Sequence, residues 1–378
     1  MPGGVGSSPV AAPGPQIRLG EGARAGDTGA VQRSSRAVSL LGCLVLAACG
    51  TDAPGDALDA AAGRDGATAD ALVTDARAVD AATDARAVVT DACFPDQSAG
   101  HKVFSCHGLR FDVEVPAACV AGGCGVILDV HGLTMSAAME DANTGLRARG
   151  AAAGFVVIQP SANPAPPQSS WSTSDDALIY DFLTRAIAVY AIDADRVHMT
   201  GFSQGGFMTW RMLCAHADRF ASVAPGAAAS NCPAGGFGAA VQACRFAGAE
   251  VPARRMPILY MHGRAEQNYV PWACAQPQVD AIVAAWGLTS AGVVASSPTY
   301  TRTRWTGAGG ALLELVAHDY ASNAQVPFVP SSRLQGHCFP GSTDPGTQPG
   351  QLFSFKCEQP ASFVWGAEVV AFFVAHPR

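Results

Sequence analysis

Residues 197–206 read VHMTGFSQGG, and this stretch decides the fold. It predicts a short strand that runs into a G-x-S-x-G turn and then into a helix. In such a turn the serine, here Ser203, sits on a strained elbow that lifts its hydroxyl clear of the sheet. Glycine is expected at Gly201 and Gly205, because a Cβ at either position would collide with the neighbouring strand or helix. The stretch therefore predicts a nucleophilic serine.

The sequence around the turn separates this interpretation from a chance match. The pattern is loose, and the chain contains 41 glycines. However, an alternating apolar strand precedes the turn, and apolar residues at helical spacing follow it at Met208, Met212 and Leu213. This context favours a strand, elbow and helix.

From Cys93 onward, strand and helix signals alternate, which predicts an α/β fold with a mostly parallel central sheet flanked by helices. An antiparallel pair is expected in residues 101–115, turning at His107-Gly108. The other predicted strands are residues 125–130, 155–159, 197–202, 220–225, 257–262 and 312–317, the last of the sheet. Helices are expected after residue 134 through about residue 151, from 176 to about 191 and from 361 to 375.

A base and an acid follow the serine in the order that the α/β-hydrolase fold requires. His337 lies beyond the last predicted strand, where that order places the base; a surface-loop histidine is the alternative. Glu266 and Asp319 each follow a strand, so both are candidates for the acid. Glu266 is preferred, because its loop follows the second predicted strand after Ser203.

The chain resembles the bacterial polyhydroxybutyrate depolymerase and feruloyl esterase family of secreted serine esterases over roughly residues 100–375. The motifs that carry the resemblance are HG at 131–132, DD at 175–176, GFSQGG at 201–206, HG at 262–263 and GHCFPG at 336–341. Two positions depart from the family, which usually has Asp in place of Glu266 and Trp in place of Phe339. The first leaves the acid open, and the second keeps an aromatic residue beside the histidine.

The resemblance implies an α/β-hydrolase fold and two-step acyl transfer without a cofactor. Ser203, deprotonated by His337, attacks an ester carbonyl while the backbone N–H groups of Leu133 and Gln204 hold the oxyanion. Only 62 residues lie between Ser203 and Glu266, too few for a large lid domain. An open cleft of this kind suits a polymer or a polymer-linked ester.

The substrate stays open between polyhydroxyalkanoates, feruloyl or acetyl esters of xylan, and small lipids. Trp171, Tyr269 and Trp272 are candidates to line the substrate cleft, with core packing as the alternative for each. Two other functions compete: a non-catalytic surface lipoprotein that binds glycan or polymer, and a peptidase of the same fold.

The N-terminal region predicts export. Residues 31–49 have the basic start, short apolar stretch and small-residue end of a signal peptide, and their LAAC ending resembles a lipobox. Cys49 is then the lipidated residue and the membrane anchor; an ordinary cleaved signal is the alternative. Residues 1–30 look foreign to such a signal and are interpreted as untranslated or disordered.

Residues 50–92 are predicted to be a tether, and residues 93–378 one catalytic domain. The tether is rich in Ala and Asp, with nine Asp against three Arg, which favours a solvated coil over a packed domain. Transient helix is the alternative for its alanine-rich parts.

The charge of the chain limits its possible partners. A net charge of −7 without a basic cluster argues against nucleic acid, and the oligomeric state is left open.

Ten cysteines lie beyond Cys49, and an even number in an exported chain predicts up to five disulfides. Adjacent cysteines suggest the pairs Cys93/Cys106, Cys119/Cys124 and Cys232/Cys244. No metal is expected, because the chain lacks C-x-x-C and H-E-x-x-H.

Overall fold

The computed structural model describes residues 89–232, 244–327 and 332–378. Residues 1–30, the predicted signal with Cys49, and the tether up to residue 88 lie outside the described residues. Asp91, inside the predicted tether, accepts a hydrogen bond from Arg185 at 3.0 Å. Contacts with the domain therefore begin slightly before Cys93.

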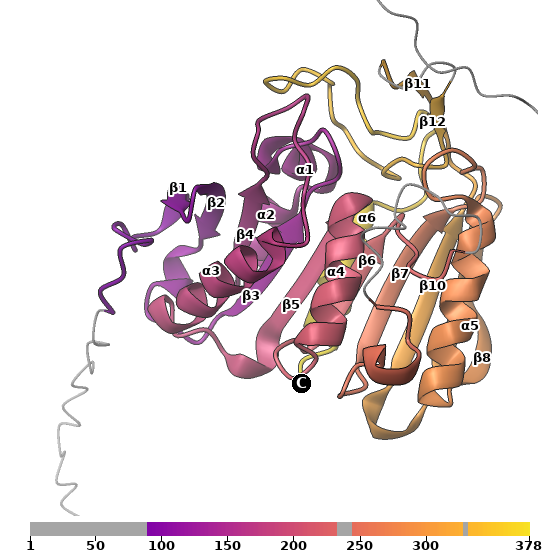
Figure 1. Cartoon of the computed structure of the whole chain (residues 1–378), viewed down its shortest axis with the longest axis horizontal. Coiled ribbons are helices and arrows are strands. Elements are labelled where there is room, and N and C mark those ends of the chain that lie inside the picture. Colours follow the sequence, from indigo (N-terminus) through magenta and orange to yellow (C-terminus); the bar gives the residue numbers. More distant parts are fainter. Residues whose placement is uncertain (1–88, 233–243, 328–331) are drawn as a thin grey trace, which may run out of the picture. The chain divides into compact units, whose positions relative to one another are not determined.

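The described residues form a ten-stranded sheet in the order β1-β2-β4-β3-β5-β6-β7-β10-β9-β8 (Figure 1). From β4 to β10 in this order, all neighbouring strands are parallel, and antiparallel pairs complete both edges. The strands are β1 (Gly100–Cys106), β2 (Leu109–Val115), β3 (Gly125–Val130), β4 (Phe155–Ser161), β5 (Val197–Phe202), β6 (Ser222–Gly226), β7 (Pro257–Gly263), β8 (Thr289–Ser297), β9 (Tyr300–Thr306) and β10 (Leu312–His318).

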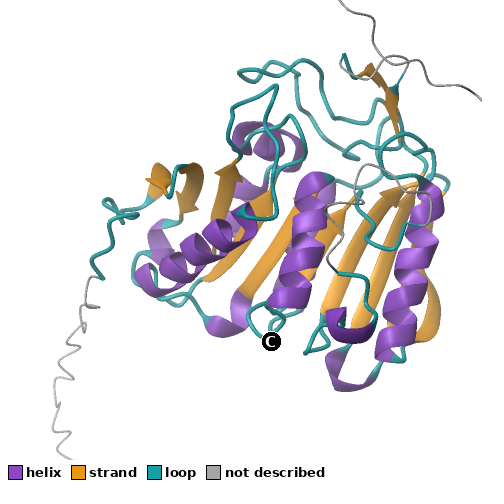
Figure 2. Ribbon diagram, in the orientation of Figure 1, coloured by secondary structure: helices purple, strands orange, loops and turns teal. Residues whose placement is uncertain are grey.

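The central strands are buried on both faces because helices cover each side of the sheet (Figure 2). Phe182 in α3, Met208 in α4 and Val279 in α5 belong to the core of one face. Met139 in α1 and Val369 in α6 belong to the core of the other. The helices are α1 (Ala137–Thr144), α2 (Leu146–Ala152), α3 (Asp175–Val189), α4 (Gln204–Ala215), α5 (Ala275–Trp286) and α6 (Trp365–Ala375). The predicted α/β fold is confirmed.

One local prediction was wrong and one hairpin was not predicted, each for an identifiable reason. The helix predicted up to residue 151 is two helices, because Gly145 adopts a left-handed conformation (φ 62°) between α1 and α2. The hairpin β8–β9 was not predicted. It extends the sheet beyond β10 with mostly exposed or half-buried residues, so it lacks the apolar run of a central strand.

The predicted last strand, β10, is followed by a second, two-stranded sheet. Its strands are β11 (Ser322–Gln325) and β12 (Arg333–Gln335), which pair antiparallel. They belong to the long segment between β10 and α6, which lies above the sheet in Figure 1.

Five disulfides join the ten cysteines of the described residues. The pairs Cys93–Cys106 and Cys119–Cys124 are confirmed. The predicted pair Cys232/Cys244 is wrong, because Cys244 bonds to Cys214 in α4 and Cys232 bonds to Cys274 just before α5. The remaining bonds are Cys214–Cys244, Cys232–Cys274 and Cys338–Cys357. Proximity along the chain was a poor guide where the partner sits on α4 or at the start of α5.

In the described part of the chain, no helix combines the length and the apolar character needed to cross a membrane.

Candidate active site

Ser203 occupies the strained turn between β5 and α4. Its backbone has φ 53° and ψ −115°, and its N–H donates to the Gly226 carbonyl at 2.9 Å. A Cβ on Gly205 would lie 1.8 Å from the Val130 oxygen, and one on Gly201 would lie 2.6 Å from the Gly205 backbone. The expected crowding at both glycines is therefore confirmed, and it is what allows β5 and α4 to meet at so sharp an angle.

His337 follows β12 and lies almost fully buried beside the elbow. Its backbone N–H donates to the Leu334 carbonyl at 2.8 Å, which tightens the turn that carries the ring. The ring packs between Phe202 and Tyr269, with centroid distances of 4.8 and 5.2 Å. These contacts fix the position of the imidazole.

Glu266 is the carboxylate that reaches His337. Its Oε1 lies 2.7 Å from His337 Nδ1 and accepts the Val270 N–H at 2.6 Å. The contact with Nδ1 has the length of a hydrogen bond but not its angle, as is common before substrate is bound. A fully buried carboxylate needs such partners, and Glu266 is 1% exposed.

Asp319, the alternative acid, is engaged elsewhere. Its Oδ2 accepts from Arg264 Nη1 at 3.0 Å, and its side chain is 46% exposed. Its backbone N–H donates to the Thr299 carbonyl, so the turn after β10 directs it toward the β9 edge. Of the two acids, the structure brings only Glu266 to His337.

Close backbone contact between two loops sets the distance from Glu266 to His337. A Cβ on Gly263 would lie 2.2 Å from the Gly336 oxygen, and a Cβ on Gly336 would lie 2.6 Å from the Glu266 nitrogen. Larger residues at either glycine would push the loops apart. Sequence reasoning noted both glycines within motifs but did not foresee that they touch.

His262 supports the same carboxylate and was not predicted as a site residue. Its Nδ1 accepts from the Tyr260 hydroxyl at 2.8 Å, so its Nε2–H donates to the Val270 carbonyl at 2.7 Å. Burial lowers the pKa of His262, which keeps the ring neutral. It thereby holds the loop whose Val270 N–H binds Glu266. The HG motif at 262–263 was the available signal.

Two free backbone N–H groups lie beside Ser203. The first bond of α4 runs from Phe207 N–H to Ser203 O, so the Gln204 N–H has no acceptor within the helix. Among the described residues, the Leu133 N–H also has no acceptor. A Cβ on Gly132 would lie 3.2 Å from Ser203 Cβ, which brings the Leu133 peptide against the serine.

His131 fixes the direction of the Leu133 N–H. Its Nε2 accepts from the Ala162 N–H at 3.0 Å, which leaves the proton on Nδ1 to donate to the Gly132 carbonyl at 2.7 Å. That carbonyl and the Leu133 N–H belong to one planar trans peptide, so they point in opposite directions. Burial lowers the pKa of His131 to about 4, which keeps this arrangement across neutral pH.

Trp171 and Trp272 do not line the cavity, and the core-packing alternative holds for both. Trp171 is buried because its indole N–H donates to the His131 carbonyl at 2.9 Å and its backbone bonds the Gln204 side chain. Trp272 packs beside His262 instead. Tyr269 does line the cavity, and its hydroxyl oxygen accepts a hydrogen bond from the Ser332 hydroxyl at 2.8 Å.

Ser203 and His337 share one small, mostly apolar cavity of about 70 Å³. In the described part of the chain, no hydrogen bond joins the Ser203 hydroxyl to the His337 ring. The walls that sequence reasoning missed come mainly from the long segment before α6. The lining residues are Leu133, Thr134, Ser203, Gln204, Phe207, Tyr269, Val270, Val326, Leu334, His337, Phe353 and Phe355.

A buried acidic pair lies close to the start of the loop between β3 and α1. Asp129 in β3 and Glu140 in α1 are each 1% exposed, and each has one buried carboxylate oxygen without a hydrogen-bond partner among the described residues. Burial raises the pKa of Asp129 to about 7 and that of Glu140 well above its usual range. Gln159 Nε2 donates to Asp129 at 2.7 Å. The pair therefore keeps at least one proton at neutral pH.

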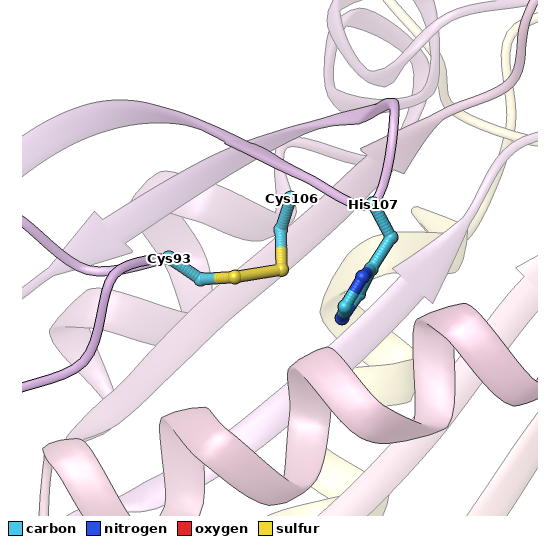
Figure 3. Close-up of side chains that lie close together, drawn as sticks. All are labelled: Cys93, Cys106 and His107. Atoms are coloured by element: carbon cyan, nitrogen blue, oxygen red, sulfur yellow. A yellow bond between two sulfur atoms is a disulfide. The ribbon is translucent and has the colours of Figure 1, made fainter.

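One group of possible metal ligands occurs in the described residues, and it is not a metal site. Figure 3 shows Cys93, Cys106 and His107 side by side. The two sulfurs form a disulfide, so they are not thiolates. His107 Nε2 lies 2.9 Å from Asp181, which occupies the imidazole.

The mostly parallel sheet, the serine elbow after β5 and the order serine, acid, histidine define an α/β-hydrolase fold. No protein-family model matches the chain. It is similar to a bifunctional acetylxylan esterase/xylanase from Neocallimastix patriciarum, at 26% identity over 141 residues, which are 36% of this chain and 18% of that protein. The chain thus spans about a fifth of that relative's length.

Two solved structures are also similar. An acetyl xylan esterase from Aspergillus awamori has a TM-score of 0.45 and 17% identity. The match covers 55% of this chain and 87% of the esterase chain. Est1E from Butyrivibrio proteoclasticus, with ferulic acid bound, has a TM-score of 0.37 and 14% identity, covering 48% of this chain and 85% of its own.

Proposed function

We propose that the protein is a serine esterase that hydrolyses carboxylic ester bonds. One observation carries the proposal: the elbow serine shares a cavity with a histidine whose Nδ1 lies 2.7 Å from a buried carboxylate. A serine hydroxyl is a weak nucleophile unless a base can take its proton. Here Ser203 is the nucleophile, His337 the base and Glu266 the acid that orients it.

The reaction runs in two steps. His337 Nε2 takes the Ser203 proton as the oxygen attacks the ester carbonyl, and the Leu133 and Gln204 N–H groups bind the oxyanion. His337 returns the proton to the leaving alcohol, which leaves an acyl-serine. Water, deprotonated by the same ring, then attacks the acyl group and releases the acid. Glu266 stabilises the imidazolium that forms in each step.

The cavity favours a short acyl group. Its volume of about 70 Å³ holds only a few water-sized groups, and its walls are mainly apolar. The names of the similar proteins include acetyl xylan and ferulic acid. Acetyl groups on a polymer fit this size better than a feruloyl group or a polyhydroxybutyrate chain held entirely inside the cavity.

We also propose export and a lipid anchor at Cys49. Five disulfides support an oxidising compartment outside the cytosol. Each buried CH₂ of an acyl chain supplies about 0.8 kcal/mol of membrane binding. We expect Cys49→Ala to move the protein from the membrane fraction to the soluble exported fraction; unchanged fractionation would contradict the anchor.

The esterase activity is tested with p-nitrophenyl acetate, without added metal. Wild-type protein should turn it over, and Ser203→Ala should remain folded while losing nearly all turnover. Ser296→Ala, an exposed serine on β8, is the matched control and should keep wild-type activity. Folded Ser203→Ala with full turnover would exclude the mechanism. A wild-type protein without turnover that still binds polymer would favour the non-catalytic alternative, and cleavage of peptides in place of esters would favour a peptidase.

A further inference from the structure

Residues 339–357, called the 339–357 loop from here on, form a closed loop directly after His337. A disulfide joins Cys338 to Cys357, with the two Cα atoms 5.1 Å apart. The Cys357 N–H also donates a hydrogen bond to the Phe339 carbonyl at 3.2 Å. The two ends of the loop are therefore fixed to one another beside the histidine.

This loop supplies two aromatic walls of the Ser203 cavity, Phe353 and Phe355. Their ring centroids lie 4.7 Å apart, and the Phe355 ring lies 6.2 Å from the ring of Phe202, which precedes Ser203. Phe355 is buried, and Phe353 is half-buried. The space open to an acyl group therefore depends on where the loop holds these two rings.

Asp344 is the buried centre of the 339–357 loop. Its side chain is fully buried, and its Oδ1 accepts from the Gly346 N–H at 3.0 Å. Its Oδ2 accepts from the Gln351 side-chain amide at 2.7 Å and from the Ser354 hydroxyl at 2.8 Å. A longer bond of 3.5 Å comes from the side-chain amide of Asn143 in α1. An ionised carboxylate only accepts hydrogen bonds, so a buried one requires donors of this kind.

Ser354 links Asp344 to both cavity walls. It stands between Phe353 and Phe355 in the sequence, and its hydroxyl bonds the carboxylate while the two rings line the cavity. The same hydroxyl accepts the Lys356 N–H at 3.1 Å. Fixing Ser354 therefore fixes the backbone that carries both rings.

Asn143 ties this arrangement to α1. Its side-chain amide donates to the Met139 carbonyl at 2.8 Å, and its Oδ1 accepts from the Ser342 hydroxyl at 2.7 Å. The Asp344 N–H in turn donates to the Ser342 hydroxyl at 3.1 Å. Asp344 is thus held in place by a helix outside the loop.

We propose that Asp344 is a positioning residue for acyl-chain selectivity: it holds the 339–357 loop so that the two aromatic rings close the Ser203 cavity around a short acyl group. The inference rests on the proposed esterase function and names a residue that limits the acyl group at that site. Asp344 does not line the cavity, so it acts through Phe353 and Phe355. Without its carboxylate, the Ser354 hydroxyl loses its acceptor, the rings move apart and a longer acyl group enters.

The test measures the ratio of kcat/KM for p-nitrophenyl butyrate over p-nitrophenyl acetate. We expect Asp344→Ala to raise this ratio about threefold to tenfold. Both esters are measured on one preparation, so a loss of folded protein does not change the ratio. The matched control is Glu314→Ala. Glu314 is a fully buried carboxylate on β10 that accepts from Arg302 and Arg304 and does not line the cavity. It should keep the wild-type ratio.

Three further variants test whether Asp344 acts through the rings. In a Phe353→Ala background, Asp344→Ala should raise the ratio by less than about twofold, because residues that act through one another are not additive. Ser354→Ala should shift the ratio in the same direction as Asp344→Ala. Ser354→Thr keeps the hydroxyl and should keep the wild-type ratio.

An unchanged ratio in Asp344→Ala, an equal rise in Glu314→Ala or a fully multiplied rise in the double variant would each overturn the proposal. If Asp344→Ala does not fold, Ser354→Ala decides by the same criterion. A wild-type protein without p-nitrophenyl acetate turnover would be a failure of the esterase function instead. Hydrogen exchange then still tests the loop: Asp344→Ala should speed exchange of the backbone amides in residues 345–357, and unchanged exchange there would overturn the positioning role.

Discussion

The two cavities at the carboxyl edge of the sheet are built in opposite ways. The Ser203 cavity is small and mostly apolar, and its reactive polar atoms come from the strained turn at Ser203 and from His337, which contacts the buried Glu266 carboxylate outside the cavity wall. The second cavity, lined by Arg110 and Asp112 of β2 and Ser161 of β4, has a larger volume of about 430 Å³, and its charges are paired on β2 at the half-exposed edge of the sheet. The comparison indicates that the Ser203 cavity gathers its polar groups around one reacting atom, whereas the second cavity spreads paired charges along the edge of the sheet.

The largest expected effect distinguishes the two candidate acids. Glu266→Gln should lower kcat for p-nitrophenyl acetate by about 10²–10⁴, because the amide cannot stabilise the imidazolium and favours the wrong His337 tautomer. Asp319→Asn removes only a surface ion pair with Arg264 and should change kcat by less than about threefold. Both variants are first checked for folding by circular dichroism. A collapse at Asp319 with a mild effect at Glu266 would reverse the assignment.

A smaller loss of kcat is expected when His131 no longer donates a hydrogen bond to the Gly132 carbonyl, which belongs to the same peptide as the Leu133 N–H. His131→Leu should lower kcat about 10–100-fold with little change in KM, because oxyanion binding acts only in the transition state. His198→Leu is the matched control, since His198 is also buried and neutral, with a pKa of about 3, but packs on Phe373 away from the cavity. Equal losses in both variants would mean that His131 matters only for stability.

The Ser203 cavity can also be enlarged without changing the second cavity. Phe353→Ala removes a wall of the Ser203 cavity and should raise the ratio of kcat/KM for the butyrate over the acetate ester about threefold to tenfold. Val374→Ala, exposed on α6, serves as the control. If chain length preference is unchanged in Phe353→Ala, this side chain does not limit the acyl group.

The smallest effect concerns the acidic pair beneath residues 132–138. Because burial raises the folded-state pKa of Asp129 to about 7, the folded protein holds a proton that the unfolded chain has lost. The free energy of unfolding should therefore fall as pH rises from about 4 to 7. Asp129→Asn cannot ionise and should lose less stability between pH 5 and pH 8. Urea unfolding at both values measures this, and identical pH dependence in both proteins would contradict it.

The sequence predicted the features that depend on residues close together in the chain. The apolar runs of β3 to β7 and the elbow at Ser203 follow from residues close together in the chain. The positions of Glu266 and His337 after strands followed from the order of the fold, and the structure brings these two side chains together.

The remaining features depend on contacts between distant segments. The Gly263–Gly336 contact, the Phe353 and Phe355 walls and the polar cavity join loops that no periodicity connects. Trp171 was a candidate for the cleft with core packing as the alternative, and the structure favours core packing because its indole N–H donates to the His131 carbonyl inside the core. The edge hairpin β8–β9 was missed because its strands carry no buried apolar face.

Covalent labelling tests the central assignment most directly. Wild-type protein is treated with diethyl p-nitrophenyl phosphate, and the intact mass, the labelled peptide and the remaining p-nitrophenyl acetate turnover are measured together. We expect one diethylphosphoryl group on Ser203, with activity lost in proportion to labelling. Stoichiometric labelling at another residue, or full turnover after Ser203 is labelled, would contradict the assignment of this cavity as the esterase site.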